Sequence, residues 1–491
     1  MTGMNETAIP VPAVPPLGAE LDWLWPDDRR PMPLAALVLA AVAGAVAAVV
    51  LPAAPAGLGV LLLGASAAAT TAPALRGRLG VHEIVYAALA GLLLLVVVVR
   101  DADWFVTLAL LGFVGTASFA LTRGRSILAV LLGGVSLPLA VLRSLPWVAR
   151  GLRRQAPAGR APLTLWLRPT LLTIGLLAMF GTLFASADAV FAALLPDLEL
   201  DVGRLALRAF LFAVFTAVSL AAAFLAAAPP RWDVLAPKAA RPVRLVEWVV
   251  PIGALVALFC LFVGVQLTAL FGGNEHILRT AGLTHADYAR SGFGQLVAVT
   301  LLTLTVVGAA ARWAPRGTAR ERLMLRVILG SLCLLTLVVV ASALYRLHLY
   351  EEAFGFTRLR LFMNAFESWL GLLVLLVMAA GVRLDGRWLG RALVATAAAT
   401  LLALAAVNPD GFVAHRNVDR WKATGKIDVG YLGSLSADAV PAVDRLPEPL
   451  RSCVLNDISV ADGGIAGLNA GRSRARALLD DRPPSAAACL P

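Results

Sequence analysis

Charge is scarce in this chain. Only 15% of its 491 residues are charged, whereas about 25% are charged in a typical soluble domain. Lysine is rarer still, because Lys238, Lys422 and Lys426 are the only lysines among 42 basic residues. The net charge of +11 does not indicate nucleic acid here, since arginines of a hydrophobic chain gather in the cytoplasmic loops that set membrane topology. We therefore expect a lipid bilayer, and no nucleic acid, as a partner.

Signatures of soluble enzymes are also missing. The sequence has no Walker loop, no H-E-x-x-H motif and no G-x-S-x-G motif. The stretch "VHEIVY" (81–86) begins like a zinc peptidase motif but lacks the second histidine. No zinc-ligand spacing is present, so we expect no metal and no cofactor. These absences argue against an ATP-driven pump or a metalloprotease and favour a role other than catalysis.

Long apolar runs are what the sequence has in abundance, since 59% of its residues are hydrophobic. The runs are roughly twenty residues long, the length that crosses a bilayer as a helix, and they lack the alternation of barrel strands. The predicted fold is all-α: a polytopic transmembrane helical bundle of about 11–12 hydrophobic segments with a small helical C-terminal tail domain. The segments lie near 33–52, 56–72, 82–99, 103–121, 126–142, 170–187, 206–227, 248–271, 293–311, 325–344, 361–381 and 390–407.

The charges of the connecting segments predict an orientation. Residues 143–168 carry six arginines and no acid, which places them in the cytoplasm, and the acidic residues of 188–201 place that loop outside. Alternation then puts 345–360 and the C-terminal tail outside. The first half breaks this pattern. Either 126–142, which is short and contains a Gly-Gly pair and a proline, is a re-entrant or interfacial helix, or the N-terminus lies outside.

Three regions follow from these patterns. Residues 1–32 are polar and proline-rich, do not form a signal peptide, and are expected to be a flexible N-terminal tail. Residues 33–407 form the multi-span transmembrane domain. Residues 408–491 form a small extracytoplasmic helical domain that begins with a cap at Asn408 and with Pro409 in the first turn. Abundant arginine and alanine indicate a bacterial genome, and hence the bacterial cytoplasmic membrane.

Five stretches together resemble a family of bacterial polytopic membrane proteins defined only by a domain of unknown function. The resemblance covers roughly 180–480. It implies an inner-membrane protein with many spans and a polar C-terminal tail, and it implies no activity, cofactor or catalytic residue. The stretches are "LFASADAVF" (183–191), "GLTHADYARSGFGQLVAV" (282–299), "YRLHLYEEAFGFTRLR" (345–360), "NPDGFVAHRNVDR" (408–420) and "DVGYLGSLSADAVPAV" (428–443).

A dense group of charges lies between two apolar segments. His348 and Glu352 share a helix face, and Gly355 can end that helix so that later arginines fold back. Charged residues at the end of a span are costly unless they are paired or wetted, so they form either a ligand or ion site or a salt-bridge cluster that joins two spans. The candidate polar or ion site comprises Arg346, His348, Glu351, Glu352, Arg358, Arg360, Asn364, Glu367 and Asp188.

Two carboxylates of that group lie within or beside apolar segments. Glu367 is about two turns into an apolar helix, where it could carry a proton or pair with an arginine of the group. Asp188 is close to a membrane boundary, which favours a capping or interfacial role over proton carriage. A further acidic motif, Asp101-Ala102-Asp103, lies between two segments and is a weak signal for a metal-dependent transferase.

Four cysteines complete the inventory of reactive side chains. Cys260 and Cys333 lie in apolar segments and behave there as small hydrophobic residues. Cys453 and Cys489 lie in the tail, and an extracytoplasmic tail would allow a disulfide between them. In addition, the arginines and tryptophans of 143–168 could bind anionic lipid at the membrane surface, or this segment is a plain topogenic loop.

Three functions are compatible with these features. The first is a transporter or permease whose polar pathway includes 345–367. The second is a scaffold or sensor of the cell envelope whose tail binds a protein partner outside. The third is a membrane-embedded transferase that uses Asp101, Asp103 or Asp188. The number of segments and the carboxylates within them favour the first.

Overall fold

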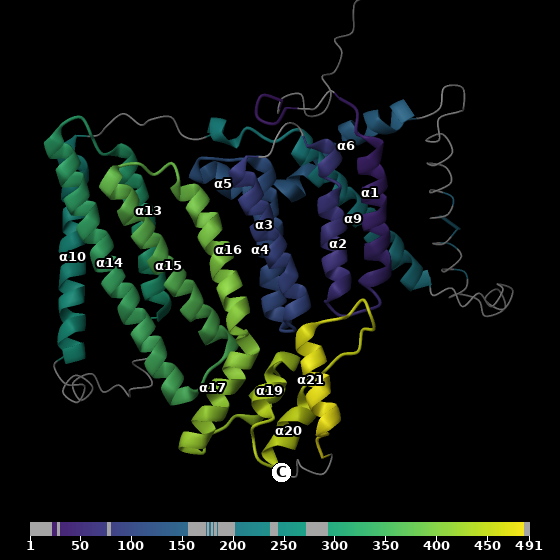
Figure 1. Cartoon of the computed structure of the whole chain (residues 1–491). Helices are drawn as coiled ribbons and strands as arrows, with labels where there is room; N and C mark the ends of the chain where they lie inside the picture. Colours follow the sequence, from purple (N-terminus) through teal and green to yellow (C-terminus); the bar gives the residue numbers. More distant parts are fainter. Residues whose placement is uncertain are drawn as a thin grey trace, which may run out of the picture.

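The computed structural model describes residues 22–26, 30–75, 80–155, 202–235, 244–271 and 293–485, and five single residues between 173 and 184. Within these ranges all regular structure is helical, so the predicted all-α fold is confirmed (Figure 1). Eight of the described helices are long and apolar enough to cross a membrane, and a ninth span arises if one bent pair crosses once. The chain is therefore a polytopic helical membrane protein. Most of the predicted segment 170–187 lies outside the described residues.

The helices follow the predicted hydrophobic segments within a few residues, except for α14 and for α6, which continues 13 residues beyond the predicted end at 142. The bounds in the membrane domain are α1 Leu34–Val50, α2 Leu58–Ala69, α3 Val81–Val99, α4 Asp103–Thr122, α5 Ile127–Gly134, α6 Ser136–Gln155, α9 Val202–Ala227, α10 Leu245–Phe271, α13 Phe293–Trp313, α14 Ala319–Phe354, α15 Arg358–Arg383 and α16 Leu389–Val407. The tail contains α17 Pro409–Thr424, α18 Val429–Gly433, α19 Val440–Val443, α20 Leu450–Asp457 and α21 Ala470–Asp481, and short 3-10 turns occupy Ala72–Ala74, Trp232–Leu235 and Ala437–Ala439.

The membrane helices form two lobes with separate hydrophobic cores. We call α1–α6 and α9 the N-lobe, and α10 and α13–α15 the C-lobe; α16 lies between them, against α15 on one side and α3 and α4 on the other (Figure 1). In the N-lobe, α1 approaches α9 closely because its buried face is made of alanines and Gly44. A Cβ atom at Gly44 would lie 2.6 Å from the carbonyl oxygen of Phe212. Small residues at such spacing let membrane helices pack backbone to backbone.

The segment 126–142 is not a straight span, and its bend fits either a broken span or a re-entrant one. Helices α5 and α6 meet at Val135 with a bend of 70°. The hydroxyl of Ser118 on α4 donates to the carbonyl oxygen of Gly133 and accepts from the backbone N–H of Leu137 at 3.1 Å. A side chain of a neighbouring helix thus satisfies backbone groups that the break leaves without helical partners, which a membrane interior requires.

Helix α14 is longer than its predicted segment 325–344. Its 36 residues span about 54 Å, well beyond the roughly 30 Å hydrocarbon core. A capping box of Thr318 and Glu321 starts the helix, and Gly355, at a φ of 82°, ends it. The charged residues 345–354 are therefore its last helical turns. Arg420 of the tail donates to the carbonyl oxygen of Ala353 at 2.7 Å and so satisfies one of the terminal acceptors of this helix.

The tail helices surround a core of their own at one end of both lobes, where α3 and α14 end and α4 and α15 begin. We call this end the tail edge (Figure 1, lower part). Val413, Val440 and Val454 are fully buried in the tail core, and Phe356 and Leu361 of the C-lobe pack against it. The opposite end is the arginine edge. It carries Arg312, Arg316, Arg320, Arg322, Arg326, Arg383, Arg387 and Arg391 on the ends of α13 to α16 and their connections.

Candidate functional site

Asp410 joins the two lobes to the tail. The turn at Asn408 and Pro409 starts α17 and places Asp410 in its first turn, where the carboxylate is fully buried. It accepts two hydrogen bonds from Arg358 of α15, at 2.9 and 2.5 Å, and one from the indole N–H of Trp104 on α4 at 3.0 Å. The backbone N–H of Ser436 adds a fourth at 2.8 Å. Burial by itself raises the pKa of Asp410, but the Arg358 guanidinium together with the hydrogen bonds from Ser436 and Trp104 holds this pKa below its ordinary value.

Asp101 and Asp438 form an acidic pair beside Asp410. The backbone N–H of Asp101 donates to Oδ2 of Asp438 at 2.7 Å, and the backbone N–H of Ala437 donates to Oδ2 of Asp101 at 3.2 Å. Arg472 of α21 forms an ion pair with the other oxygen of Asp101. The remaining oxygen, Oδ1 of Asp438, is buried without a hydrogen-bond partner in the described part of the chain. Burial raises the pKa of Asp438 to about 6.

Further polar contacts hold the ends of membrane helices to the tail. Arg100 donates to the carbonyl oxygens of Ala405, at 2.7 Å, and Ala406, and so satisfies terminal acceptors of α16. Asn469 donates to the carbonyl oxygens of Val97 at 2.9 Å and Arg100 at 2.8 Å. Its own oxygen accepts from the first N–H groups of α21, which makes Asn469 both the cap of that helix and a link to α3.

The candidate site from the sequence divides into separate groups. Arg358 turns toward Asp410, as above. Arg360 folds back, where it bonds the carbonyl oxygen of Gly355 and lies 4.2 Å from the ring centre of Tyr350. Glu351 is buried and accepts from the amide of Asn364 at 2.7 Å.

The other members of the candidate site lie away from this contact. His348 and Glu352 form the expected pair one helical turn apart, 3.2 Å between ring nitrogen and carboxylate oxygen, on an exposed face. Arg346 is half-buried on α14. Asp188 lies outside the described residues. The residues predicted to form one polar site are thus separated. Glu351 contacts Asn364, His348 and Glu352 form an exposed pair, and Arg358 binds the tail.

Glu367 differs from all of these acids. Its side chain is 0% exposed, and neither carboxylate oxygen has a hydrogen-bond partner among the described residues. It lies on α15 between two contacts with α14: Asn364 with Glu351, and Gly371, where a Cβ atom would lie 3.2 Å from Val340. A lone carboxylate in this setting must be neutralised by a proton or a cation, because burying an uncompensated charge is very costly.

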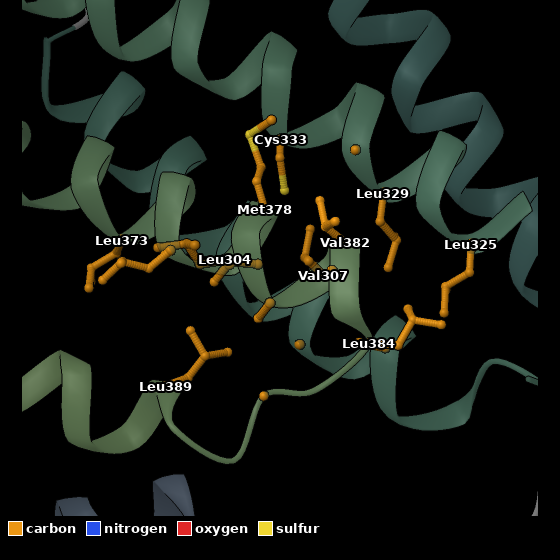
Figure 2. Close-up of a pocket in the computed structure, with 18 of the residues that line it drawn as sticks. Leu304, Val307, Leu325, Leu329, Cys333, Leu373, Met378, Val382, Leu384 and Leu389 are labelled. Atoms are coloured by element: carbon orange, nitrogen blue, oxygen red, sulfur yellow. The ribbon is translucent and has the colours of Figure 1, made fainter. Parts of the chain in front are cut away.

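A cavity of about 500 Å³ lies between the C-lobe and the start of α16, at the arginine edge. Helices α13, α14 and α15 form most of its wall, and Ile127 of α5 reaches it from the N-lobe. Figure 2 shows its leucine, valine and methionine side chains with Cys333 among them. Arg316 and Arg326, both exposed, complete the lining.

A family profile described as a domain of unknown function (DUF4153) matches residues 87–446. The chain belongs to this family. The match begins well before the stretch from about 180 over which the resemblance was evident, and it ends before 480. It includes Arg358, Asp410 and Asp438 but stops ahead of Asn469 and Arg472. Comparisons with curated proteins and with solved structures give no match. Membership in DUF4153 therefore assigns no activity, and the chemistry must be argued from the site.

Sequence reasoning missed Asp410, Asp438, Asn469 and Arg472. A signal existed for the first two, because "NPDGFVAHRNVDR" and "DVGYLGSLSADAVPAV" contain them and carry the resemblance to the family. Nothing local marks Arg472, whose partner Asp101 lies 371 positions earlier. That partner also bears on the transferase hypothesis. Asp101 is engaged by Arg472 and by Ala437, and the described residues contain no group of three metal-ligating side chains.

The disulfide prediction concerns one described residue and one that is not. Cys453 takes part in a disulfide, whereas Cys260 and Cys333 are free thiols. Cys489 lies outside the described residues, so its pairing with Cys453 stays a prediction. Part of 143–168 is also described. There Trp147 is fully buried against Phe224, so this tryptophan does not face lipid. Anionic-lipid binding by the segment stays a prediction as well.

Proposed function

We propose that the protein is a transporter-like permease of the bacterial cytoplasmic membrane that binds a proton or small cation at Glu367. The observation that carries this proposal is the pair of buried carboxylate oxygens without a partner. An ionisable residue inside a membrane helix is retained at a cost and is a functional residue by default. The other buried acids described above have amide, arginine or backbone partners; Glu367 keeps its binding capacity for something that is not part of the protein.

Polar and hollow regions approach Glu367 from opposite ends of the C-lobe. Toward the tail edge lie Glu351 and Asn364. A further buried polar pair, Ser342 with Gln266 at 3.2 Å, joins α14 to α10 near the level where Gly371 packs against Val340. Toward the arginine edge the cavity begins at Leu373, six residues or about 9 Å further along α15. Because the cavity wall is aliphatic, the proposed pathway depends on the polar groups near Glu367 and not on the cavity.

A flux measurement tests the proposal. Purified protein is placed in vesicles that hold a pH-sensitive dye, and a potential is applied across the membrane. We expect proton uptake above that of empty vesicles, and loss of this uptake in Glu367→Gln. The matched control is Glu352→Gln, because Glu352 is exposed and its charge lies on the same pair of helices. Equal uptake by wild type and Glu367→Gln would remove Glu367 from the pathway.

The proposal includes an orientation, with the arginine edge in the cytoplasm and the tail outside, because arginine-rich connections stay inside. Single cysteines introduced at two exposed positions test it with a membrane-impermeant thiol reagent. Arg445→Cys in the tail should react in intact cells. Arg387→Cys, at a side chain that is 95% exposed at the arginine edge, should react only after the cells are opened. The reverse pattern would invert the orientation and direct the search for a partner of the tail to the cytoplasm.

A second function, an envelope sensor, is supported by one observation: the tail contacts connections of both lobes. Besides the contacts at Asp410, the carbonyl oxygen of Leu468 accepts from the N–H of Leu58 at 3.0 Å, next to the turn between α1 and α2. An envelope protein that binds the tail would therefore act on both lobes at once. Cross-linking in intact cells distinguishes this role, because it requires a partner captured by the tail of wild type and released when the tail is undocked.

A further inference from the structure

The wall of the cavity at the arginine edge is suited to binding a hydrocarbon chain. Its lining is almost entirely aliphatic: Figure 2 shows Leu325, Leu329 and Leu384 on one side of the view, and Leu373 and Leu389 on the other. Its volume of about 500 Å³ falls in the range of ligand pockets. In a bilayer the molecules beside an apolar cavity of that size are lipids, whose acyl chains gain dispersion contacts with such a wall.

The two arginines of the lining have guanidinium N–H groups that can donate to a ligand. Arg316 bonds the carbonyl oxygen of Ala311, and no acidic partner is found for Arg316 or Arg326 in the described ranges. The nearest acid in the chain, Glu321, is committed to the capping box, where it accepts from the N–H of Thr318 at 2.9 Å. Asp385, which lies between two lining residues, is 3.9 Å from Arg387. Guanidinium groups recognise phosphate through paired hydrogen bonds, so two arginines that form no ion pair in the described ranges favour an anion.

Exposed tryptophans place the mouth of the cavity at the level of lipid headgroups. Trp313 ends α13 and Trp388 precedes α16, and both are exposed, at 46% and 37%. Tryptophan is enriched at membrane interfaces, where its ring is half apolar and half polar. An amphiphile with its chain in the cavity would therefore hold its charged group at the depth where Arg316 and Arg326 lie.

We propose that this cavity binds an anionic phospholipid, with an acyl chain between α13, α14 and α15 and the phosphate at Arg316 and Arg326. The proposal does not depend on Glu367. It requires two independent features, an apolar hollow and a basic mouth, and each can be removed without the other.

Two variants separate these features. Arg316→Gln with Arg326→Gln removes the charge at the mouth. Its control is Arg320→Gln with Arg387→Gln, which removes the same charge from the same edge at positions outside the lining. Gly330→Leu fills the hollow. A Cβ atom at Gly330 meets no atom within 4 Å, and this helical glycine lines the cavity, so the larger side chain has space to enter it.

The experiment is a lipid titration of the full chain, delipidated in mild detergent. Native mass spectrometry counts bound lipid, and the thermal midpoint reports stabilisation. Phosphatidylglycerol is compared with phosphatidylcholine of the same chains and with inorganic phosphate. We expect phosphatidylglycerol to bind the Arg316→Gln/Arg326→Gln variant roughly ten- to a hundredfold more weakly than wild type, since hydrogen bonds to charged groups contribute about 1.5–3 kcal/mol. The control variant should match wild type, and Gly330→Leu should lose saturable binding while remaining folded.

Three outcomes would overturn the proposal. An equal loss in the control variant would mean that the edge attracts anions without a defined site. Equal binding of phosphatidylglycerol and phosphatidylcholine by wild type would mean that the charged group is not recognised. Stabilisation by inorganic phosphate that equals that of the lipid and survives Gly330→Leu would assign the arginines to free phosphate.

Discussion

The two ends of the membrane domain differ in their contacts: charged, hydrogen-bonded groups lie at the tail edge, and an apolar cavity lies at the arginine edge. At the tail edge the lobes are joined by charged groups with specific partners: Asp410 bonds Trp104 of the N-lobe and Arg358 of the C-lobe. At the arginine edge an apolar cavity of about 500 Å³ lies between the C-lobe and the start of α16, and α16 in turn packs on Tyr86 and Val130 of the N-lobe. Directional hydrogen bonds fix the distance and orientation of the groups that they join. An apolar cavity offers little resistance to a change in its width. We infer that relative motion of the lobes is concentrated at the arginine edge, with the tail edge as its fixed end.

The largest expected effect comes from removing the charge that neutralises Asp410. Arg358→Ala leaves a fully buried carboxylate without its cation, and breaking such a pair costs about 3–5 kcal/mol. The matched control is Arg445→Ala, which removes an exposed pair with Asp419 at 2.9 Å and should cost under about 1 kcal/mol. Thermal unfolding and protease release of the tail provide the measurement. Equal losses in the two variants would show that the tail edge is not the fixed end.

The second prediction concerns Asp438 and pH. Burial raises its pKa from 3.8 to about 6, so between these values the folded chain holds a proton that the unfolded chain releases. Its stabilising contribution is complete below pH 3.8 and is lost as the pH rises through about 6, an effect of about 3 kcal/mol. The backbone N–H of Asp101 and the charge of Arg100 lower this pKa, whereas the carboxylates of Asp101 and Asp410 raise it.

Unfolding of wild type and Asp438→Asn between pH 4.5 and 7.5 checks this sign. Wild type should lose stability with rising pH, and Asp438→Asn should show a smaller change and exceed wild type at pH 7.5. The low pKa of Asp410 keeps that carboxylate ionised across the window, so it contributes no opposing trend. Parallel curves for the two proteins would mean that another group is responsible.

A third, smaller effect is expected at Asn469. Asn469→Asp keeps the oxygen that caps α21 but places an acceptor opposite the carbonyl oxygens of Val97 and Arg100. We expect a loss of about 1–3 kcal/mol from the contact between tail and N-lobe. Hydrogen exchange should show faster exchange at the end of α3 while α21 remains protected. Asn456→Asp, at an exposed position of α20, is the control, and a change of the same size there would remove the specific role of Asn469.

The two edges also differ in how far they could be predicted from the sequence, because local features leave a signal in the sequence and contacts between distant residues do not. Hydropathy is a local property, so the segments 82–99 and 390–407 agree with α3 and α16 within one residue. The pair of His348 and Glu352 follows from helical spacing in the same way. Partners that meet through the fold have no local signal: Arg358 and Asp410 are 52 positions apart. A cavity is less predictable still, because it depends on how closely whole helices approach one another.

The smallest expected effect concerns two glycines, one beside the cavity and one in the N-lobe. A Cβ atom at Gly308, on α13 beside the cavity, meets no atom within 4 Å, whereas at Gly44 it would lie 2.6 Å from the carbonyl oxygen of Phe212. Gly308→Ala should therefore stabilise the chain by about 0.5–1 kcal/mol, the gain of alanine over glycine within a helix. Gly44→Ala should destabilise it, because α1 and α9 must move apart. Thermal midpoints of both variants decide the point. A loss of stability in Gly308→Ala would mean that the helices at the arginine edge pack more closely than this cavity implies, and that the hollow end is not the compliant one.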